Sequence, residues 1–125
     1  MVRFGIAGFG HHAVKRLMPG FARAQRCRIT ALSRRDPQRA RDSAQQFGIP
    51  HAFTTTAELC ACPEVDAVFV ASPDAVHRSD VLEAVRHRKH VLVEKPMALD
   101  PASARRMIVA ADQAGRVLMC AHVLR

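Results

Sequence analysis

The sequence contains no tryptophan and no tyrosine, and its six phenylalanines are its only aromatic residues apart from histidine. It also has no apolar run close to the roughly 20 residues that a membrane-spanning helix needs, so we expect no contact with a membrane. No secretory signal is visible, because Met1 leads directly into a stretch typical of a fold element. These absences favour a cytoplasmic protein built around an aliphatic core.

Cysteine is also scarce, with four residues in 125. Cys60 and Cys62 are too close together for a usual zinc knuckle, and no second pair has matching spacing, so we predict no metal site. Cys27 lies at the start of one predicted strand and Cys120 within another, where cysteine packs as a small apolar residue. Free thiols in a reducing compartment are therefore expected.

Acidic residues are outnumbered by basic ones, 11 against 19, which gives a formal net charge of +8. Such an excess raises the question of nucleic-acid binding. The arginines, however, are scattered along the predicted helix faces, and no Trp or Tyr lies among them to stack on bases. We therefore predict no nucleic-acid partner and expect a basic surface used in part for phosphate groups.

What is present is an unbroken alternation of strand and helix patterns, in a chain long enough for one domain with a core. The predicted fold is α/β: a Rossmann-type, doubly wound parallel sheet of about six strands in the order 3-2-1-4-5-6, formed by residues 1–125 as a single nucleotide-binding domain. Strands are predicted at 3–7, 28–33, 51–53, 66–71, 91–93 and 117–121.

Several local signals set the predicted helices. Asp36-Pro37 and Asp100-Pro101 are typical helix starts, and Gly48 and Gly115 typical helix ends. A capping box at residues 55–58 predicts a short helix. The first helix, from about residue 10, should be kinked or split by Pro19. The last helix is expected to bury Ala104, Met107, Ile108 and Ala111.

The first predicted strand runs into the spacing Gly8-x-Gly10-x-x-Ala13, which fits the dinucleotide fingerprint. Gly8 allows a tight turn, Gly10 lets the backbone approach a pyrophosphate, and Ala13 lets the helix lie close to the strand. The free N–H groups of the helix start would face the phosphates. Cofactor contacts are accordingly predicted at Gly8, Phe9, Gly10, His11 and His12, although for His11 the alternative of a solvated helix start is favoured.

The end of the second strand indicates which dinucleotide is preferred. Binding of NAD commonly uses an acid about 20 residues after the glycines, but this chain has Ser33-Arg34-Arg35 there. A hydroxyl and a guanidinium fork suit a 2′-phosphate. Asp36, the nearby acid, is interpreted as a helix cap. We therefore predict NADP, with NAD the less favoured alternative.

Two further motifs give the chain a family resemblance: Ser72-Pro73-Asp74-Ala75-Val76-His77 after the fourth strand and Glu94-Lys95-Pro96 after the fifth. With the glycine motif, they make the chain similar over its whole length to the N-terminal half of the Gfo/Idh/MocA oxidoreductases. The resemblance implies hydride transfer between a nicotinamide and a sugar, polyol or related hydroxy or carbonyl compound. It also implies a cis peptide bond before Pro96.

The resemblance assigns roles to single residues. Lys95 would be the catalytic lysine that binds the substrate hydroxyl or carbonyl, and His122 would face the nicotinamide and substrate. Cofactor contacts would come from Glu94 and Lys95 and from the turn after the fourth strand, at Ala71, Ser72, Pro73 and His77. For His77 the sequence leaves open a second interpretation, a polar surface residue at a helix start. His12 departs from the family, which usually has an apolar residue there.

Family members continue into a second, substrate-binding domain that this sequence lacks. We therefore expect nucleotide affinity with little or no turnover by these residues alone, and an apolar flank near the last strand for the missing domain or for a homo-oligomer contact. The alternative is a nucleotide-binding or sensor module without catalysis.

Overall fold

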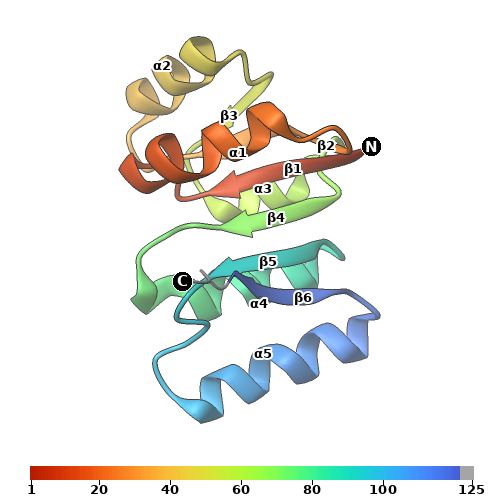
Figure 1. Ribbon diagram of the computed structural model, residues 1–125. Coiled ribbons are helices and arrows are strands. Elements are labelled where there is room, and N and C mark those ends of the chain that lie inside the picture. The colour runs from red at the N-terminus through yellow and green to blue at the C-terminus, as the bar shows by residue number, and fades with distance from the viewer. Residues whose placement is uncertain (122–125) are drawn as a thin grey trace.

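The protein is described by a computed structural model, in which residues 1–121 are placed. Six strands lie in one sheet: β1 (Val2–Ala7), β2 (Cys27–Ser33), β3 (His51–Phe53), β4 (Ala67–Val70), β5 (His90–Glu94) and β6 (Leu118–Ala121). All neighbouring strands are parallel, and their order is β3-β2-β1-β4-β5-β6 (Figure 1). The predicted fold class and strand order are confirmed.

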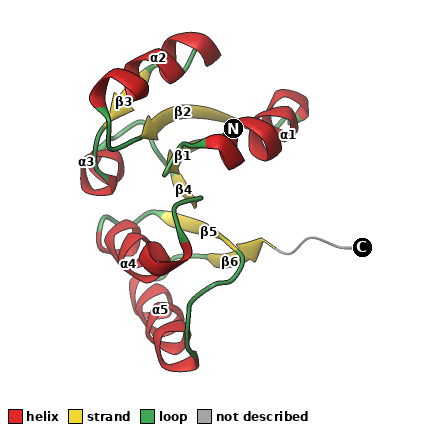
Figure 2. Cartoon of the chain, turned by 90° about the vertical axis from the view of Figure 1, so that its left-hand side faces the viewer, coloured by secondary structure: helices red, strands yellow, loops and turns green. Residues whose placement is uncertain are grey.

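Helices cover both faces of the sheet (Figure 2). One face carries α3 (Thr56–Ala61), α4 (His77–Arg86) and α5 (Pro101–Ala114), whose apolar side chains meet those of the central strands in one core cluster. The other face carries η1 (Ala13–Leu17), α1 (Met18–Arg23) and α2 (Pro37–Phe47), which enclose a second cluster around Ile6, Leu32 and Phe69. The strand β4 lies between the two clusters, so all four of its residues are buried.

The first helix is divided as Pro19 predicts. Proline has no N–H to donate to the preceding turn, and its ring displaces the carbonyl there. The helix adapts by widening into the π-helical segment η1, in which the N–H of Met18 reaches back to the carbonyl of Ala13, before α-helical geometry resumes in α1. The half-buried side chains of Val14, Leu17 and Phe21 still pack on the sheet.

The predicted caps are also confirmed. Asp36 accepts hydrogen bonds from the N–H groups of Gln38 and Arg39, and Asp100 accepts one from Ser103. Thr55 accepts one from Glu58 at the start of α3. Gly48 and Gly115 end α2 and α5 in the left-handed conformation, with φ of 65° and 64°.

One burial prediction was wrong: Ile108 in α5 is 46% exposed. The helix lies over the edge of the sheet, where only the stripe of Ser103, Met107 and Ala111 is buried. A helix on a central strand would bury a wider stripe. In the edge strand β6, Met119 is 60% exposed, and Val117 just before this strand is 54% exposed.

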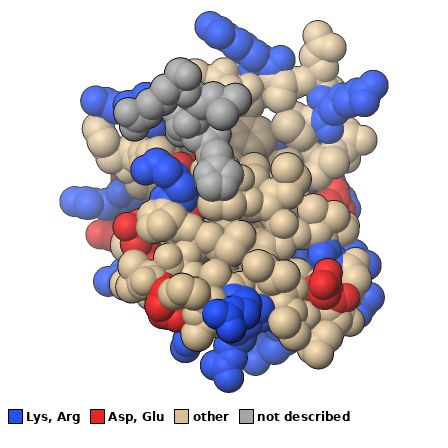
Figure 3. Space-filling model, turned by 60° about the horizontal axis from the view of Figure 1, so that its bottom comes forward, with Lys and Arg blue, Asp and Glu red and all other residues tan. Residues whose placement is uncertain are grey.

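Within residues 1–121, no helix is both long and apolar enough to cross a membrane. On the face drawn in Figure 3, Lys and Arg side chains are dispersed, with Asp and Glu between them, around a broad uncharged area. The cysteines Cys27, Cys60, Cys62 and Cys120 are free thiols. Burial raises the pKa of Cys60 to about 12, which keeps that thiol unreactive at neutral pH.

Candidate functional site

Two adjoining grooves open along the carboxyl edge of the sheet. The strands β1 and β4 are neighbours in this sheet, but the connection after β1 leads to β2 on one side and the connection after β4 leads to β5 on the other. Ligands of such sheets bind at this switch point. One groove, of about 640 Å³, runs toward the ends of β2 and β3, and the other, of about 960 Å³, toward β5 and β6. Ser72, just after β4, lines both.

The turn after β1 closes against this serine. Gly8 has a φ of +78°, and a Cβ atom built on it would lie 2.6 Å from the Cα of Ser72, so only glycine fits. Its N–H donates to the hydroxyl of Ser33 at 3.3 Å, and the N–H of Phe9 donates to the carbonyl of Ser33 at 2.8 Å. The turn is therefore fixed to both neighbouring strands.

The residues of this turn fit a dinucleotide phosphate. A Cβ on Gly10 would meet nothing closer than the Gly8 carbonyl oxygen at 3.9 Å, so the backbone here can be approached closely from the groove. The N–H groups of the first helical turn have no acceptor within their own helix, as at any helix start. The side chain of Phe9 is fully buried against Phe47, so this residue offers the groove its backbone only.

The predicted selectivity residues follow β2. Ser33 and Arg34 line the smaller groove together with Arg35, and the guanidinium of Arg34 donates to the Ser43 hydroxyl at 3.1 Å. This contact from α2 holds Arg34 in the groove wall. Asp36 acts as the helix cap, and its hydrogen bonds, first that from the N–H of Arg39, hold its pKa below the usual range.

The structure decides against one of the two sequence interpretations of His77, that of a polar surface residue. Only 1% of the residue is exposed, so the surface interpretation was wrong. Its Nδ1 lies 2.8 Å from the carbonyl oxygen of Pro96 and its Nε2 lies 2.8 Å from that of Ser72. Both ring nitrogens are thus occupied by the protein, in the wall of the larger groove. Ala71 and Pro73 line the larger and the smaller groove respectively.

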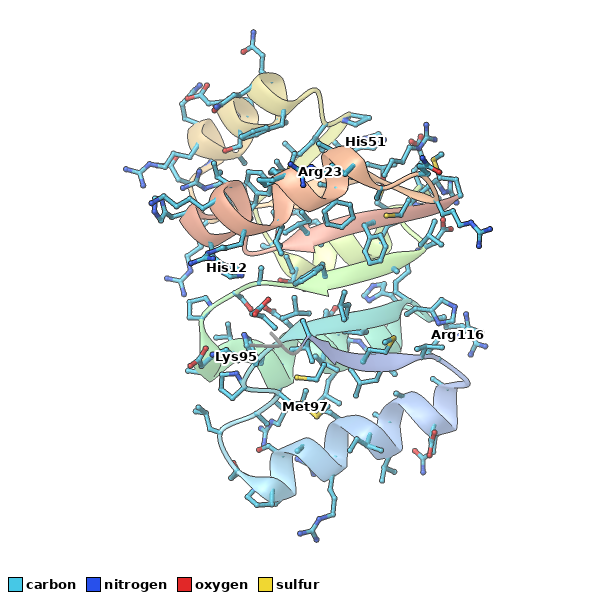
Figure 4. The ribbon with its side chains drawn as sticks, viewed as in Figure 1. His12, Arg23, His51, Lys95, Met97 and Arg116 are labelled. Atoms are coloured by element: carbon cyan, nitrogen blue, oxygen red, sulfur yellow. The ribbon has the colours of Figure 1, made fainter. Side chains whose placement is uncertain are left out.

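Glu94 and Lys95 lie at the end of β5 in the larger groove. Glu94, with 17% of its side chain exposed, has its Oε2 3.4 Å from the Nε2 of His12, which crosses from the start of the first helix. Lys95 is exposed and, among the described residues, its ammonium makes no hydrogen bond or ion pair. Figure 4 shows His12 and Lys95 on the same side of the molecule, at which the strands end. The peptide bond from Lys95 to Pro96 is cis, as the resemblance implies.

Some expected residues are not gathered into the grooves, and some contributors were missed. His11 is exposed at the helix start, and His122 lies outside the described residues. Missed contributors are Thr54, Thr55 and Thr56 after β3, Ser79 and Asp80 in α4, and Arg16 and Asp74 in the larger groove. The threonines could have been found, because they follow a parallel strand at the same edge. Within the described part of the chain, no three His, Cys, Asp or Glu side chains converge as metal ligands do.

A parallel sheet in this order, with a side-chain-free turn after β1 and grooves at the switch point, defines a Rossmann-type dinucleotide-binding domain. A sequence profile described as "Oxidoreductase family, NAD-binding Rossmann fold" matches residues 2–122, and the chain belongs to this family, Gfo/Idh/MocA. The members of this family are NAD(P)-dependent oxidoreductases.

Individual relatives support the assignment. The chain is 38% identical over 125 residues to 1,5-anhydro-D-fructose reductase of Ensifer adhaerens, covering all of this chain and 37% of that protein. It is 36% identical over 119 residues to scyllo-inositol 2-dehydrogenase (NADP(+)) of Bacillus subtilis, covering 95% of this chain and 36% of that protein. A 3-ketoreductase from Actinomadura kijaniata, in complex with TDP-benzene and NADP, superposes with a TM-score of 0.89 at 31% identity, covering 95% and 37% of the two chains. The chain thus spans a little over a third of the length of these relatives.

Proposed function

We propose that this domain binds NADP along the two grooves and supplies the cofactor side of an oxidoreductase active site. The observation that carries the proposal is the contact between Gly8 and Ser72, which leaves a backbone cradle free of side chains where the grooves meet. The pyrophosphate would lie on the helix N–H groups at Gly10, His11 and His12. The adenosine half would then extend toward β2 and β3, and the nicotinamide half toward β5.

The preference for NADP rests on the residues after β2. No carboxylate there is free for a ribose hydroxyl, because Asp36 caps α2. Arg34, which donates a hydrogen bond to Ser43, and Arg35 present positive charge to the smaller groove. Ser33, whose hydroxyl accepts from the N–H of Gly8, lines the same groove. A 2′-phosphate would receive charge-assisted hydrogen bonds from these guanidinium groups. The relatives from Bacillus and Actinomadura, with NADP in their descriptions, favour the same assignment.

When bound, the nicotinamide would supply hydride transfer. The chain's own part in the chemistry is assigned to Lys95, whose ammonium is exposed in the larger groove. It would donate a hydrogen bond to the reacting oxygen of the substrate and exchange a proton with it at Nζ. Glu94 would bind on the cofactor side. His122 would complete this end of the site, as the family resemblance implies.

The substrate we propose is a sugar, polyol or related hydroxy or carbonyl compound, in line with the names of the relatives. The larger groove is open, so these residues alone would neither orient such a substrate nor exclude water, and we expect little or no turnover from residues 1–125 by themselves. A further domain, or a second copy, would rest on the exposed apolar side chains of Val117 and Met119 beside β6.

Fluorescence titration with NADPH and NADH tests the cofactor assignment. We expect NADPH to bind more tightly, and the variant Arg34→Asp to weaken NADPH by about 10- to 100-fold while leaving NADH nearly unchanged, since one charge-assisted contact is lost. Arg41→Asp, on the exposed face of α2, makes the same change of charge away from the groove and is the control. Equal losses in the two variants, or equal affinity of the unaltered chain for both cofactors, would contradict the assignment.

A further inference from the structure

His77 is one of the few polar side chains that the fold buries completely. It is the first residue of α4, and it joins two loops that come from different strands. Its Nε2 lies 2.8 Å from the carbonyl oxygen of Ser72, in the loop after β4. Its Nδ1 lies 2.8 Å from the carbonyl oxygen of Pro96, in the loop after β5. The imidazole ring therefore bridges the two loops that shape the larger groove.

Both contacts of the ring are made to backbone. Each ring nitrogen lies within hydrogen-bond distance of a carbonyl oxygen, and the two carbonyls belong to loops that follow neighbouring strands. We propose that His77 acts as a positioning residue, which ties the Lys95–Pro96 loop to the nucleotide-binding turn.

The same helix also holds Ser72 by its side chain. Asp80 in α4 accepts a hydrogen bond from the Ser72 hydroxyl at 2.6 Å, so α4 contacts both the hydroxyl and the carbonyl oxygen of this residue.

The inference rests on the proposed function. Gly8 lies against Ser72, Ser72 is bound by His77, and His77 binds Pro96, which follows Lys95 directly. This chain of contacts runs from the phosphate cradle to the proposed catalytic lysine. By holding the two carbonyls at a fixed separation, His77 would set where Lys95 stands relative to a bound nicotinamide without touching the cofactor.

The positioning role is tested with His77→Gln, whose amide can donate to one of the carbonyls but presents an oxygen to the other. We expect NADPH affinity to fall by roughly three- to tenfold, the effect of about one hydrogen bond. Affinity for adenosine 2′,5′-bisphosphate, which reaches only the smaller groove, should stay within about twofold. His87→Gln, at the C-cap position of the same helix, should change neither. Unchanged NADPH affinity, or equal losses for both ligands, would overturn the role, whereas a chain that binds neither ligand before mutation would contradict the proposed function instead.

Discussion

The two edges of the sheet use their charged residues in different ways. At the amino edge, Arg3 and Asp66 bind each other through two side-chain hydrogen bonds of 3.0 and 2.9 Å, and the N–H of Arg3 adds a third of 2.9 Å. Close by, the ammonium of Lys89 donates to the carbonyl oxygens of Val65 and Cys62 at 2.6 and 3.2 Å. These charges are neutralised or bound within the protein, and they fasten the loop before β4.

At the carboxyl edge the charged groups are far less occupied by the protein. Lys95 and Arg35 are exposed, and Arg34 uses part of its guanidinium on Ser43. The buried hydrogen bonds at this edge, those of His77 and Ser33, instead hold backbone in place. The comparison teaches that one edge stabilises the fold and the other is kept available for a ligand. Substitutions at the first should change stability alone, and those at the second should change binding.

The largest effect is expected from Gly8→Ala. The new Cβ would lie 2.6 Å from the backbone of Ser72, in a residue that must keep a φ of +78°. Moving the turn away from Ser72 distorts both grooves, so we expect NADPH affinity to fall by at least about tenfold, together with a loss of stability of about 1–3 kcal/mol. Fluorescence titration and thermal unfolding measure the two effects.

Gly20→Ala is the matched control, because a Cβ at this position in α1 meets nothing within 4 Å. Alanine is the better helix former, and the variant should gain up to about 1 kcal/mol in stability. Its NADPH affinity should equal that of the unaltered chain. A Gly8→Ala protein that binds NADPH normally would show that the contact with Ser72 is not needed for the cradle.

Much of the fold could be predicted because its signals are local. The continuous apolar run of β4 indicates a buried strand by itself, without information on the neighbouring strands. Asp36 and Asp100 cap helices through residues only two or three positions away. The glycine turn was predicted in the same way. The rule that ligands bind beyond the ends of parallel strands then located Lys95 correctly at the edge that carries the grooves.

What could not be predicted depends on contacts between distant residues. The burial of His77 follows from its approach to Pro96, 19 residues later in the chain, and no local pattern encodes it. The exposure of Ile108 depends on α5 lying over the edge of the sheet rather than over its centre. The contact of His12 with Glu94 likewise joins two elements that meet only in the folded sheet. The role of His122 remains a prediction.

An effect of intermediate size is expected at the amino edge from Asp66→Asn. Hydrogen bonding to Arg3 lowers the pKa of Asp66 from 3.8 to about 2. A depressed pKa contributes stability that is present above about pH 4 and is lost as the pH falls toward 2. A third of the side chain is exposed, so screening limits this contribution to about 1 kcal/mol.

Chemical unfolding between pH 2 and 5 measures this contribution. The unaltered chain should lose stability across that range more steeply than Asp66→Asn, whereas Asp112→Asn, on the exposed side of α5, should keep the steep dependence. At neutral pH the NADPH affinity of Asp66→Asn should be unchanged. A weakened affinity there would mean that the amino edge does reach the ligand, against the division drawn between the two edges.

The smallest and most discriminating effects are expected from two buried hydroxyls on β2. Thr30 donates to the carbonyl of Glu64 at 2.8 Å, toward the amino edge, and Ser33 accepts from the N–H of Gly8 at 3.3 Å, at the carboxyl edge. Thr30→Val should cost about 1 kcal/mol of stability, the value of one hydrogen bond, and leave NADPH affinity alone.

Ser33→Ala should do the reverse, because the contact it removes is longer and holds the nucleotide-binding turn rather than the body of the sheet. We expect a smaller loss of stability than in Thr30→Val and a two- to fivefold weaker NADPH affinity, as for a weak hydrogen bond. The two positions lie three residues apart on one strand, so both variants alter the same strand and differ mainly in which edge they touch. If both variants lowered NADPH affinity by the same factor, binding would depend on the general stability of the sheet. The division into a structural edge and a binding edge would then be wrong.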